Sequence, residues 1–349
     1  MRAPLIGFLF AALLACEGGC SSSDGSGESS GGHAGSGGAA STSHGGTSAG
    51  SGGSSTGGHA GASGGGSVAN GGSGFGGNAN AGGANGGSSS GGANNAGSGG
   101  DDTARPGWVL AWSDEFNGMP GDGLDKSKWA YSVGPNDANM EQEYYTDRVE
   151  NSDYDGQGNF MITARLEDYM GYRYTSAKFT SSGKYEPKYG RLETRIKLPK
   201  GKGLWPAFWN LGTNIGDVGW PACGEMDIME TVGDQLTVNH GSLHGPGYSG
   251  SSPLTATYTL PKGQTFDQDF HVFAAEWEEN VVRFYVDDTL YETKTPDDVP
   301  NGKTWVYDHD VFMIVNVAVG GTLPGDPDDS IFPKSMLIDY VRVYERPAQ

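Results

Sequence analysis

The sequence predicts an all-β domain of the sandwich type, and three observations lead to that prediction. Apolar and polar residues alternate with a period of two in several short runs between residues 159 and 344, as in strands with one buried face. Gly, Pro, Asn and Asp separate these runs, as residues at turns do. No stretch of residues 105–349 repeats its apolar residues every 3.6 positions, so we expect no helical layer.

The strands are expected in chain order from this alternation. Residues 160–166 place Phe160, Ile162 and Ala164 on one face, and residues 191–198 combine a buried face with a polar one. A hairpin is expected at residues 272–286, with Glu278-Glu279-Asn280 as its turn. Two further runs, at residues 312–319 and 337–344, complete the predicted set.

Residues 1–16, MRAPLIGFLFAALLAC, have the features of an export signal: one early Arg, an apolar run from Leu5 to Leu14, and small residues at the end. The run is about half the length that a membrane-spanning helix needs. Leu13-Leu14-Ala15-Cys16 resembles the lipobox of bacterial lipoproteins, which implies a lipid on Cys16. We therefore expect an exported lipoprotein at the outer membrane or cell surface; cleavage nearby with plain secretion is the alternative.

Residues 17–104 consist mainly of Gly, Ser, Ala and Asn, with no Lys or Arg and with Phe75 as the single aromatic residue. Such a composition cannot bury enough apolar surface to offset the entropy of ordering, so we predict a disordered linker. A coil of this length has an end-to-end distance on the order of 50 Å. The chain has three cysteines, one of them in this linker and one at Cys16, and we expect no structural disulfide.

Residues 105–349 form the predicted catalytic domain and hold all eight Trp of the chain. The formal net charge of the chain is −20, which argues against nucleic acid or an anionic membrane surface as a partner and favours a neutral ligand. Aromatic residues without surrounding positive charge suit sugars, whose apolar ring faces stack on indole. We expect a monomer that meets a membrane only through the N-terminal lipid.

The segment from Trp220 to Gly233 carries three acids, Glu225, Asp227 and Glu230, within an apolar strand pattern. In a regular strand Glu230 would point away from the other two acids. One extra residue, a β-bulge between Asp227 and Glu230, would bring all three to the open face and leave Met226 in the core. The spacing therefore predicts a bulged strand with three acids on one face.

Crowded carboxyls of this kind suit a retaining glycosidase, whose two catalytic carboxyls lie about 5–5.5 Å apart. One attacks the anomeric carbon, and the other protonates the leaving oxygen. The charge of Asp227 would raise the pKa of its neighbours, which keeps the acid protonated near neutral pH. A solvated strand face and a metal site are the alternatives for three such acids.

The segment resembles the bulged Glu-x-Asp-x-x-Glu signature of glycoside hydrolase family 16, and most of all its bacterial laminarinases. Other motifs that carry the resemblance are Trp112-Ser-Asp-Glu-Phe116, Glu141-Gln-Glu-Tyr-Tyr-Thr146, Trp205-Pro-Ala-Phe-Trp209 and Ile338-Asp-Tyr-Val-Arg-Val-Tyr344. The resemblance implies a concanavalin A-like β-jelly roll with a concave cleft. It also implies cofactor-independent, retaining endo-hydrolysis of β-1,3-glucan by double displacement.

Two other functions are weighed against this one. The first is the same chemistry on mixed-linkage 1,3-1,4-β-glucan or on another β-linked polysaccharide. The second is a glucan-binding module without catalysis, which should lack one of the two catalytic acids, whereas Glu225 and Glu230 are both present.

The resemblance assigns roles to individual residues. It makes Glu225 the nucleophile, Asp227 its assistant and Glu230 the acid/base. It further implies that three tryptophans line the sugar subsites and that two other residues lie near the reaction centre; the tryptophans are Trp205, Trp209 and Trp220, and the others Arg191 and His244. Met140 departs from the Asn that many relatives have there, which leaves the contacts at the negative subsites open.

Asp339 shares strand parity with the apolar Leu337 and Val341, and a buried carboxylate needs a partner. The resemblance implies a structural calcium ion held by Asp339 and by backbone carbonyls at Glu115 and Gly158. Oxygen ligands of this kind suit calcium. A salt bridge or a backbone hydrogen bond is the alternative partner for Asp339.

Overall fold

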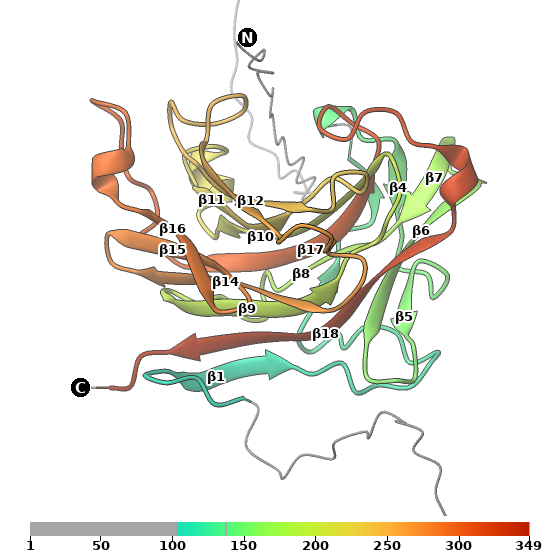
Figure 1. Cartoon of the computed structure of the whole chain (residues 1–349), viewed down its shortest axis with the longest axis horizontal. Coiled ribbons are helices and arrows are strands. Elements are labelled where there is room, and N and C mark those ends of the chain that lie inside the picture. The colour runs from blue at the N-terminus through green and yellow to red at the C-terminus, as the bar shows by residue number, and fades with distance from the viewer. Residues whose placement is uncertain (1–102, 137, 349) are drawn as a thin grey trace, which may run out of the picture. The chain divides into compact units, whose positions relative to one another are not determined.

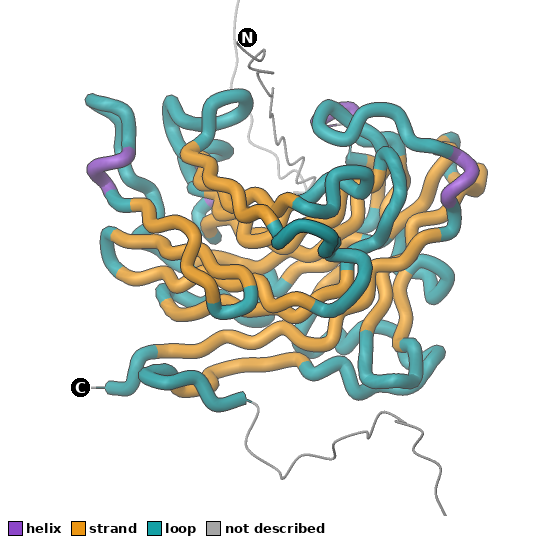
Figure 2. Tube along the Cα trace, in the orientation of Figure 1, coloured by secondary structure: helices purple, strands orange, loops and turns teal. Residues whose placement is uncertain are grey.

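The computed structural model describes residues 103–136 and 138–348, which Figures 1 and 2 show in colour. The predicted signal sequence, Cys16 and almost all of the predicted linker lie outside the described residues. Among the residues that are described, no helix has both the length and the apolar character needed to cross a bilayer.

Two β-sheets lie face to face, and strands dominate the chain trace (Figures 1 and 2). The outer sheet has 11 strands; in spatial order these are β16 (Thr289–Lys294), β15 (Val281–Val286), β14 (His271–Glu278), β9 (Gly190–Lys197), β18 (Lys334–Glu345), β6 (Phe160–Tyr169), β7 (Tyr172–Ser176), β4 (Glu143–Tyr145) and β3 (Gly134–Pro135), with β1 (Val109–Asp114) beside β18 and β5 (Ser152–Tyr154) beside β6.

The inner sheet has seven strands, in the order β13 (Leu254–Thr259), β12 (Val238–His244), β11 (Glu225–Glu230), β10 (Leu204–Gly212), β17 (Val311–Val319), β8 (Lys178–Thr180) and β2 (Ala130–Tyr131). The described helices are short: α1 (Ile215–Val218) and the 3₁₀ turns η1 (Ala138–Met140), η2 (Pro296–Asp298) and η3 (Asp329–Ile331). The all-β prediction is therefore confirmed.

Strand β17 illustrates how the inner sheet separates core from cleft. All nine of its residues are buried. Met313, Val315 and Val317 face the core between the sheets, whereas Asn316 and Ala318 line the cleft on the other face. Side chains of a strand alternate between its two faces. Both faces of β17 are covered, so its sequence is almost entirely apolar, and its polar residue Asn316 lies on the cleft face.

The predicted strands are present, and β9 has the predicted buried face and polar face. Two residues of its polar face are buried as well, since Arg191 and Glu193 are 3 % and 0 % exposed. An ion-pair network covers this face: Arg105 Nη2 lies 2.6 Å and Arg191 Nε 2.8 Å from the Glu193 carboxylate. Mutual pairing compensates for the desolvation of these charges, which an alternation pattern alone does not reveal.

The two ends of the domain meet on the outer sheet. Strand β1, near the start of the described chain, pairs antiparallel with β18, the last strand (Figure 1). The ion pair of Arg105 with Glu193 on β9 attaches the residues before β1 to the same sheet. The N-terminal end of the domain is thus fixed to the outer sheet, whereas the cleft belongs to the inner sheet.

Candidate active site

A cleft lies on the open face of the inner sheet. Its lining comes from strands β8, β10, β11, β12 and β17, from the loop around η1 and from the loop between α1 and β11. It consists of Asn136, Ala138, Asn139, Glu141, Lys178, Trp205, Ala207, Trp209, Trp220, Glu225, Asp227, Glu230, His244, Asn316 and Ala318. The lining includes the three predicted acids and the three predicted tryptophans. The predicted concave cleft is therefore present.

Strand β11 carries the predicted bulge. Against β12, Asp227 pairs with Ser242 and Glu230 with His240, so the register shifts by one residue between the two acids. Residues i and i+2 normally share a face, and the extra residue lets Glu230 share the face of Asp227 as well. Met226 is fully buried on the core side.

The acids do not form a solvated strand face. Glu225, Asp227 and Glu230 are 6 %, 5 % and 7 % exposed. Each glutamate accepts a hydrogen bond from an indole: Trp220 Nε1 donates to Glu225 Oε2 at 2.7 Å, and Trp205 Nε1 donates to Glu230 Oε1 at 3.0 Å. The two N–H donors fix the orientation of both carboxyls.

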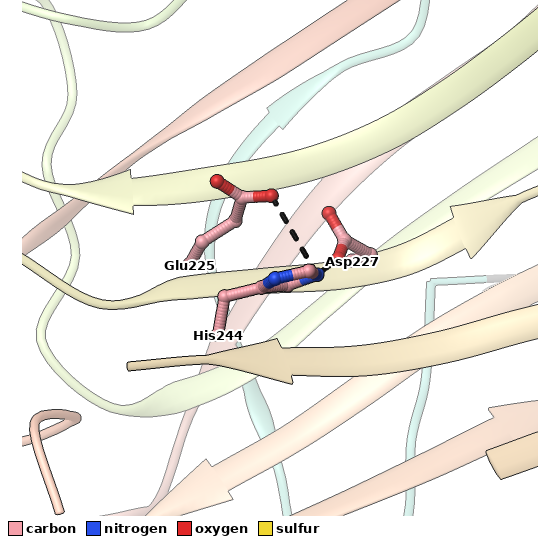
Figure 3. A group of neighbouring side chains, drawn as sticks. All are labelled: Glu225, Asp227 and His244. Atoms are coloured by element: carbon pink, nitrogen blue, oxygen red, sulfur yellow. Dashed lines mark ion pairs between the residues drawn. The ribbon is translucent and has the colours of Figure 1, made fainter. Parts of the chain in front are cut away.

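His244 lies directly opposite Glu225 in the ladder between β11 and β12. Its Nε2 is 3.1 Å from Asp227 Oδ2 and 3.9 Å from Glu225 Oε1, and Figure 3 shows the three side chains projecting from the two adjacent strands toward one another. A protonated imidazole there would stabilise the ionised carboxylates. The prediction that His244 lies near the proposed reaction centre agrees with this geometry.

Burial is the main cause of the pKa shifts in this group. It raises the pKa of Glu225 to about 8 and that of Glu230 to about 8, and the charge of Asp227 adds to both shifts. Burial also raises the pKa of Asp227 to about 7, against a hydrogen bond from Glu225. Three carboxyls that share one buried space cannot all ionise easily, so the site retains protons near neutral pH.

A row of hydrogen bonds extends the cleft floor away from the acids. Trp209 Nε1 donates to Asn316 Oδ1 at 2.8 Å, and Asn316 Nδ2 donates to the hydroxyl of Tyr145 at 3.1 Å. That hydroxyl donates to Glu141 Oε2 at 3.1 Å, which also accepts from Asn136 at 2.8 Å. The row offers the carboxylate of Glu141 and the amides of Asn136 and Asn316 to a ligand that lies along the sheet, with the buried Tyr145 hydroxyl linking them.

Sequence reasoning did not assign Asn136, Glu141, Lys178 or Asn316 to the site. The polar Asn316 in the apolar run of β17 was the available signal, because a buried polar residue in such a strand needs a function or a partner. Met140, the predicted departure, is 68 % exposed at the turn before Glu141 and is absent from the cleft lining.

A second groove continues from the cleft across β12 and β13. Glu230 lines both spaces, and the other walls of the groove are formed by His240, Ser242, Ser251, Ser252, Pro253, Thr255, Thr257 and Leu323. Burial lowers the pKa of His240, so this imidazole is neutral at neutral pH and can both donate and accept hydrogen bonds. Glu230 therefore lies between two open spaces.

Arg191 is not part of the cleft, which corrects the prediction that it lies near the reaction centre. It stands on β9 of the outer sheet, with its guanidinium 2.8 Å from Glu193 and 3.2 Å from Glu276. Leu192 and Ile196 occupy the core face of β9, so Arg191 points to the opposite, outer face. The core separates it from the acids.

The predicted calcium residues come together only in part. Strand β1 ends at Asp114, opposite Val341, and β6 begins at Phe160, opposite Ile338. The backbone that follows β1, at Glu115, and the backbone that precedes β6, at Gly158, therefore lie on the same edge of β18, near Asp339.

The Asp339 carboxylate is paired with a guanidinium in this structure. A register shift between Ile338 and Tyr340 breaks the expected parity, and the Asp339 side chain is 33 % exposed rather than buried. Arg195 Nη1 lies 2.6 Å from Asp339 Oδ2. The alternative of a salt bridge is what the structure contains, and a guanidinium already neutralises the expected calcium ligand.

A metal site at the acids is the other metal hypothesis. Among the described residues, ligand atoms of Glu225, Asp227 and His244 lie within 4.8 Å of one another. Oxygen and imidazole donors of this kind suit several divalent ions. Indole N–H groups hold Glu225 and Glu230 in fixed orientations. We therefore favour a catalytic role for these carboxyls over a metal site.

Comparisons with known proteins identify the family of the chain. The model of the glycosyl hydrolases family 16 matches residues 136–342. The chain is 40 % identical over 253 residues to a beta-glucanase of Rhodothermus marinus, a match that covers 68 % of this chain and 86 % of that protein.

Two crystal structures give the same result. The laminarinase catalytic domain of Thermotoga maritima is 49 % identical, with a TM-score of 0.63 over 68 % of this chain and 98 % of that one. The endo-β-1,3-glucanase of Pyrococcus furiosus is 45 % identical, with a TM-score of 0.64 over 69 % and 96 %. These matches confirm the predicted jelly roll, and the chain belongs to glycosyl hydrolase family 16.

Proposed function

We propose that this protein hydrolyses internal bonds of β-1,3-glucan with retention of configuration. The carrying observation is the bulged strand β11, which places two buried glutamates, each oriented by an indole, in one cleft. The similarity to a laminarinase and to an endo-β-1,3-glucanase supports the choice of substrate. We also propose a monomer as the active unit.

In the first step, ionised Glu225 attacks the anomeric carbon while protonated Glu230 gives its proton to the glycosidic oxygen. The bond from the anomeric carbon to that oxygen breaks, and the chain on the far side leaves with a new hydroxyl. The product is a glycosyl ester on Glu225. Asp227, beside Glu225, and His244 hold the charge of the nucleophile as it changes.

In the second step, Glu230 acts as a base. It takes a proton from a water molecule, whose oxygen attacks the anomeric carbon and releases Glu225 as a carboxylate. Two inversions give net retention. The protons move only among Glu230, the substrate and water, so the sequence is balanced without a cofactor.

The cleft suits a long and neutral polymer. Trp205, Trp209 and Trp220 supply apolar surface on one side of Glu230, and the hydroxyl-lined groove supplies hydrogen-bond partners on the other. Space on both sides of the acid/base favours cleavage within a chain over cleavage at its end. Lys178 is the one basic side chain besides His244 in the cleft lining that is described, which disfavours sulfated polymers.

The expected result for residues 105–349 is rapid release of short oligosaccharides from laminarin. Lichenan, agarose and cellulose should be tested beside it, with Glu225→Gln as the inactive control. Comparable rates on lichenan would indicate a mixed-linkage glucanase. Cleavage of agarose or cellulose but not laminarin would keep the mechanism and refute the proposed substrate. No cleavage of any of the polymers would favour the binding-module alternative.

We also propose that the enzyme is exported and carries a lipid on Cys16. Support comes from the Leu13-Leu14-Ala15-Cys16 sequence and the apolar run before it. Cells that produce the full chain should incorporate labelled fatty acid into it, and the label should be lost in Cys16→Ala. Cys20→Ala is the matched control and should keep the label. Equal labelling of the Cys16 variant would contradict lipidation.

A structural calcium ion remains a prediction from the family resemblance. Binding would require Asp339 to exchange Arg195 for the ion. If calcium binds, adding it to chelator-treated protein should raise the melting temperature, because a ligand that binds only the folded state stabilises it. Asp339→Asn should remove that increase. A melting temperature that does not respond to calcium would leave the Arg195 ion pair as the whole role of Asp339.

A further inference from the structure

The bulge in β11 is bridged by a side chain of the neighbouring strand. Asn239, on β12, is 0 % exposed. Its Oδ1 accepts a hydrogen bond from the backbone N–H of Glu230 at 3.2 Å, and its Nδ2 donates to the carbonyl of Ile228 at 3.3 Å. These backbone groups lie on either side of Met229, within the stretch where the register shifts. A single amide thus spans the extra residue.

The same amide connects the bulge to the outer sheet. Nδ2 of Asn239 also donates to the hydroxyl of Tyr291 on β16, at 3.3 Å. Tyr291 packs against Phe284, with ring centroids 6.2 Å apart. Gly241, which lies opposite the bulged stretch, leaves room for this contact: a Cβ there would be 2.3 Å from the Tyr291 hydroxyl oxygen.

We propose that Asn239 is the positioning residue for Glu230, a role that rests on the proposed function. Register decides the face on which a strand residue points, and a shift by one residue reverses it. The amide holds the N–H of Glu230 itself, so it fixes the bulge at the residue that must reach the glycosidic oxygen. The amide offers, on one planar group, the acceptor and the donor that Glu230 and Ile228 require together.

The test separates proton donation from general loss of structure by means of two substrates. Laminarin has a sugar leaving group that needs a proton from Glu230. A 2,4-dinitrophenyl β-glycoside of laminaribiose has a leaving group that departs without one. In Asn239→Leu, kcat/KM on laminarin should fall about 100-fold, within the range that general acid catalysis contributes. On the aryl glycoside kcat/KM should change little, because it reports the first step.

Asn151→Leu is the matched control. Asn151 is also 0 % exposed, and it holds Thr146 and the carbonyl of Thr163 by hydrogen bonds outside the cleft. This variant should lose stability. Its ratio of kcat/KM on laminarin to kcat/KM on the aryl glycoside should nevertheless equal that of the wild type. Tyr291→Phe should lower the ratio slightly, because it removes one of three contacts of the amide.

Asn239→Asp keeps the acceptor for Glu230 and places an oxygen against the Ile228 carbonyl, so an intermediate loss on laminarin is expected. If Asn239→Leu does not fold, Asn239→Asp tests the positioning role of Asn239 instead. Equal losses on both substrates, or no loss, would overturn the role of Asn239. If the wild type itself cleaved neither substrate, the proposed function would fail instead, so the two failures are distinguishable.

Discussion

Glu225→Gln is expected to lose glucan hydrolysis by at least about 10⁴-fold, a loss typical of removing a covalent nucleophile. The amide keeps the size of the side chain but cannot attack the anomeric carbon, so no glycosyl ester forms. Reducing-sugar release from laminarin measures the loss. Glu141→Gln, which changes another carboxyl of the same cleft lining, is the matched control and should keep measurable turnover.

Azide rescue identifies the nucleophile independently. In Glu225→Gly, azide can enter the space of the missing carboxylate and attack an activated aryl glycoside directly. A single displacement should give the glycosyl azide with inverted configuration. Inverted azide from Glu230→Gly would exchange the two roles.

Because Glu225→Gln removes a buried charge, this variant should be more stable than the wild type in alkaline solution. Burial raises the pKa of Glu225 to about 8, whereas an unfolded Glu has a pKa of about 4.3. The folded state therefore binds more protons between these values, and the free energy of unfolding falls as pH rises from about 4 to about 8. Gln escapes this decline, so its melting temperature should exceed that of the wild type at pH 8 and approach it at pH 4.

Glu193→Gln provides the contrast for that measurement. Although burial acts in the other direction, hydrogen bonds and charge from Arg105 and Arg191 hold the pKa of Glu193 below its ordinary value. Its charge therefore stabilises the folded state at neutral pH, and the glutamine variant should melt at a lower temperature than the wild type. A similar decrease in Glu225→Gln would contradict the crowding of charge in the cleft.

Glu230→Gln is expected to lose about 10²–10⁴-fold in kcat/KM on laminarin, the usual contribution of general acid–base catalysis. On an activated aryl glycoside its kcat/KM should stay near the wild-type value, because that leaving group needs no proton. The second step would then be slow, since no base activates water. Azide should restore kcat and give the glycosyl azide with retained configuration, because it attacks the ester on Glu225.

A different result for Glu230→Gln would contradict its role as the acid/base. Equal losses on laminarin and on the aryl glycoside would show that this side chain does more than transfer protons. His240→Ala is a useful control, because His240 lies opposite Glu230 in the ladder and lines the groove beyond it. Its loss should appear on laminarin and in KM, and azide should not restore it, because Glu225 and Glu230 are both still present.

Much of the fold and the centre of the site could be predicted, because both follow from strand parity. The alternation of residues 160–166 located β6, and the positions of Glu225, Asp227 and Glu230 required the bulge that is present. The tryptophans were found by composition and by motif. Local spacing is enough where each residue's face is set by its immediate neighbours in the chain.

The remaining residues depend on contacts between distant segments. Arg191 has the parity of an exposed face, and only the folded sheet shows that Glu193 and Glu276 hold it away from the cleft. The position of Asp339 depends on a bulge in β18. In β11 the spacing of the three acids indicates a bulge, whereas β18 has no such spacing of acids. Asn239 could not be found because its partners, Glu230 and Tyr291, lie on different sheets.

The pairing of β1 with β18 determines where the described chain enters the domain. Arg105 and β1 join the outer sheet, on the side of the core away from the cleft. None of residues 103–114 belongs to the cleft lining, so the entry of the described chain and the binding of a polymer use opposite faces of the domain.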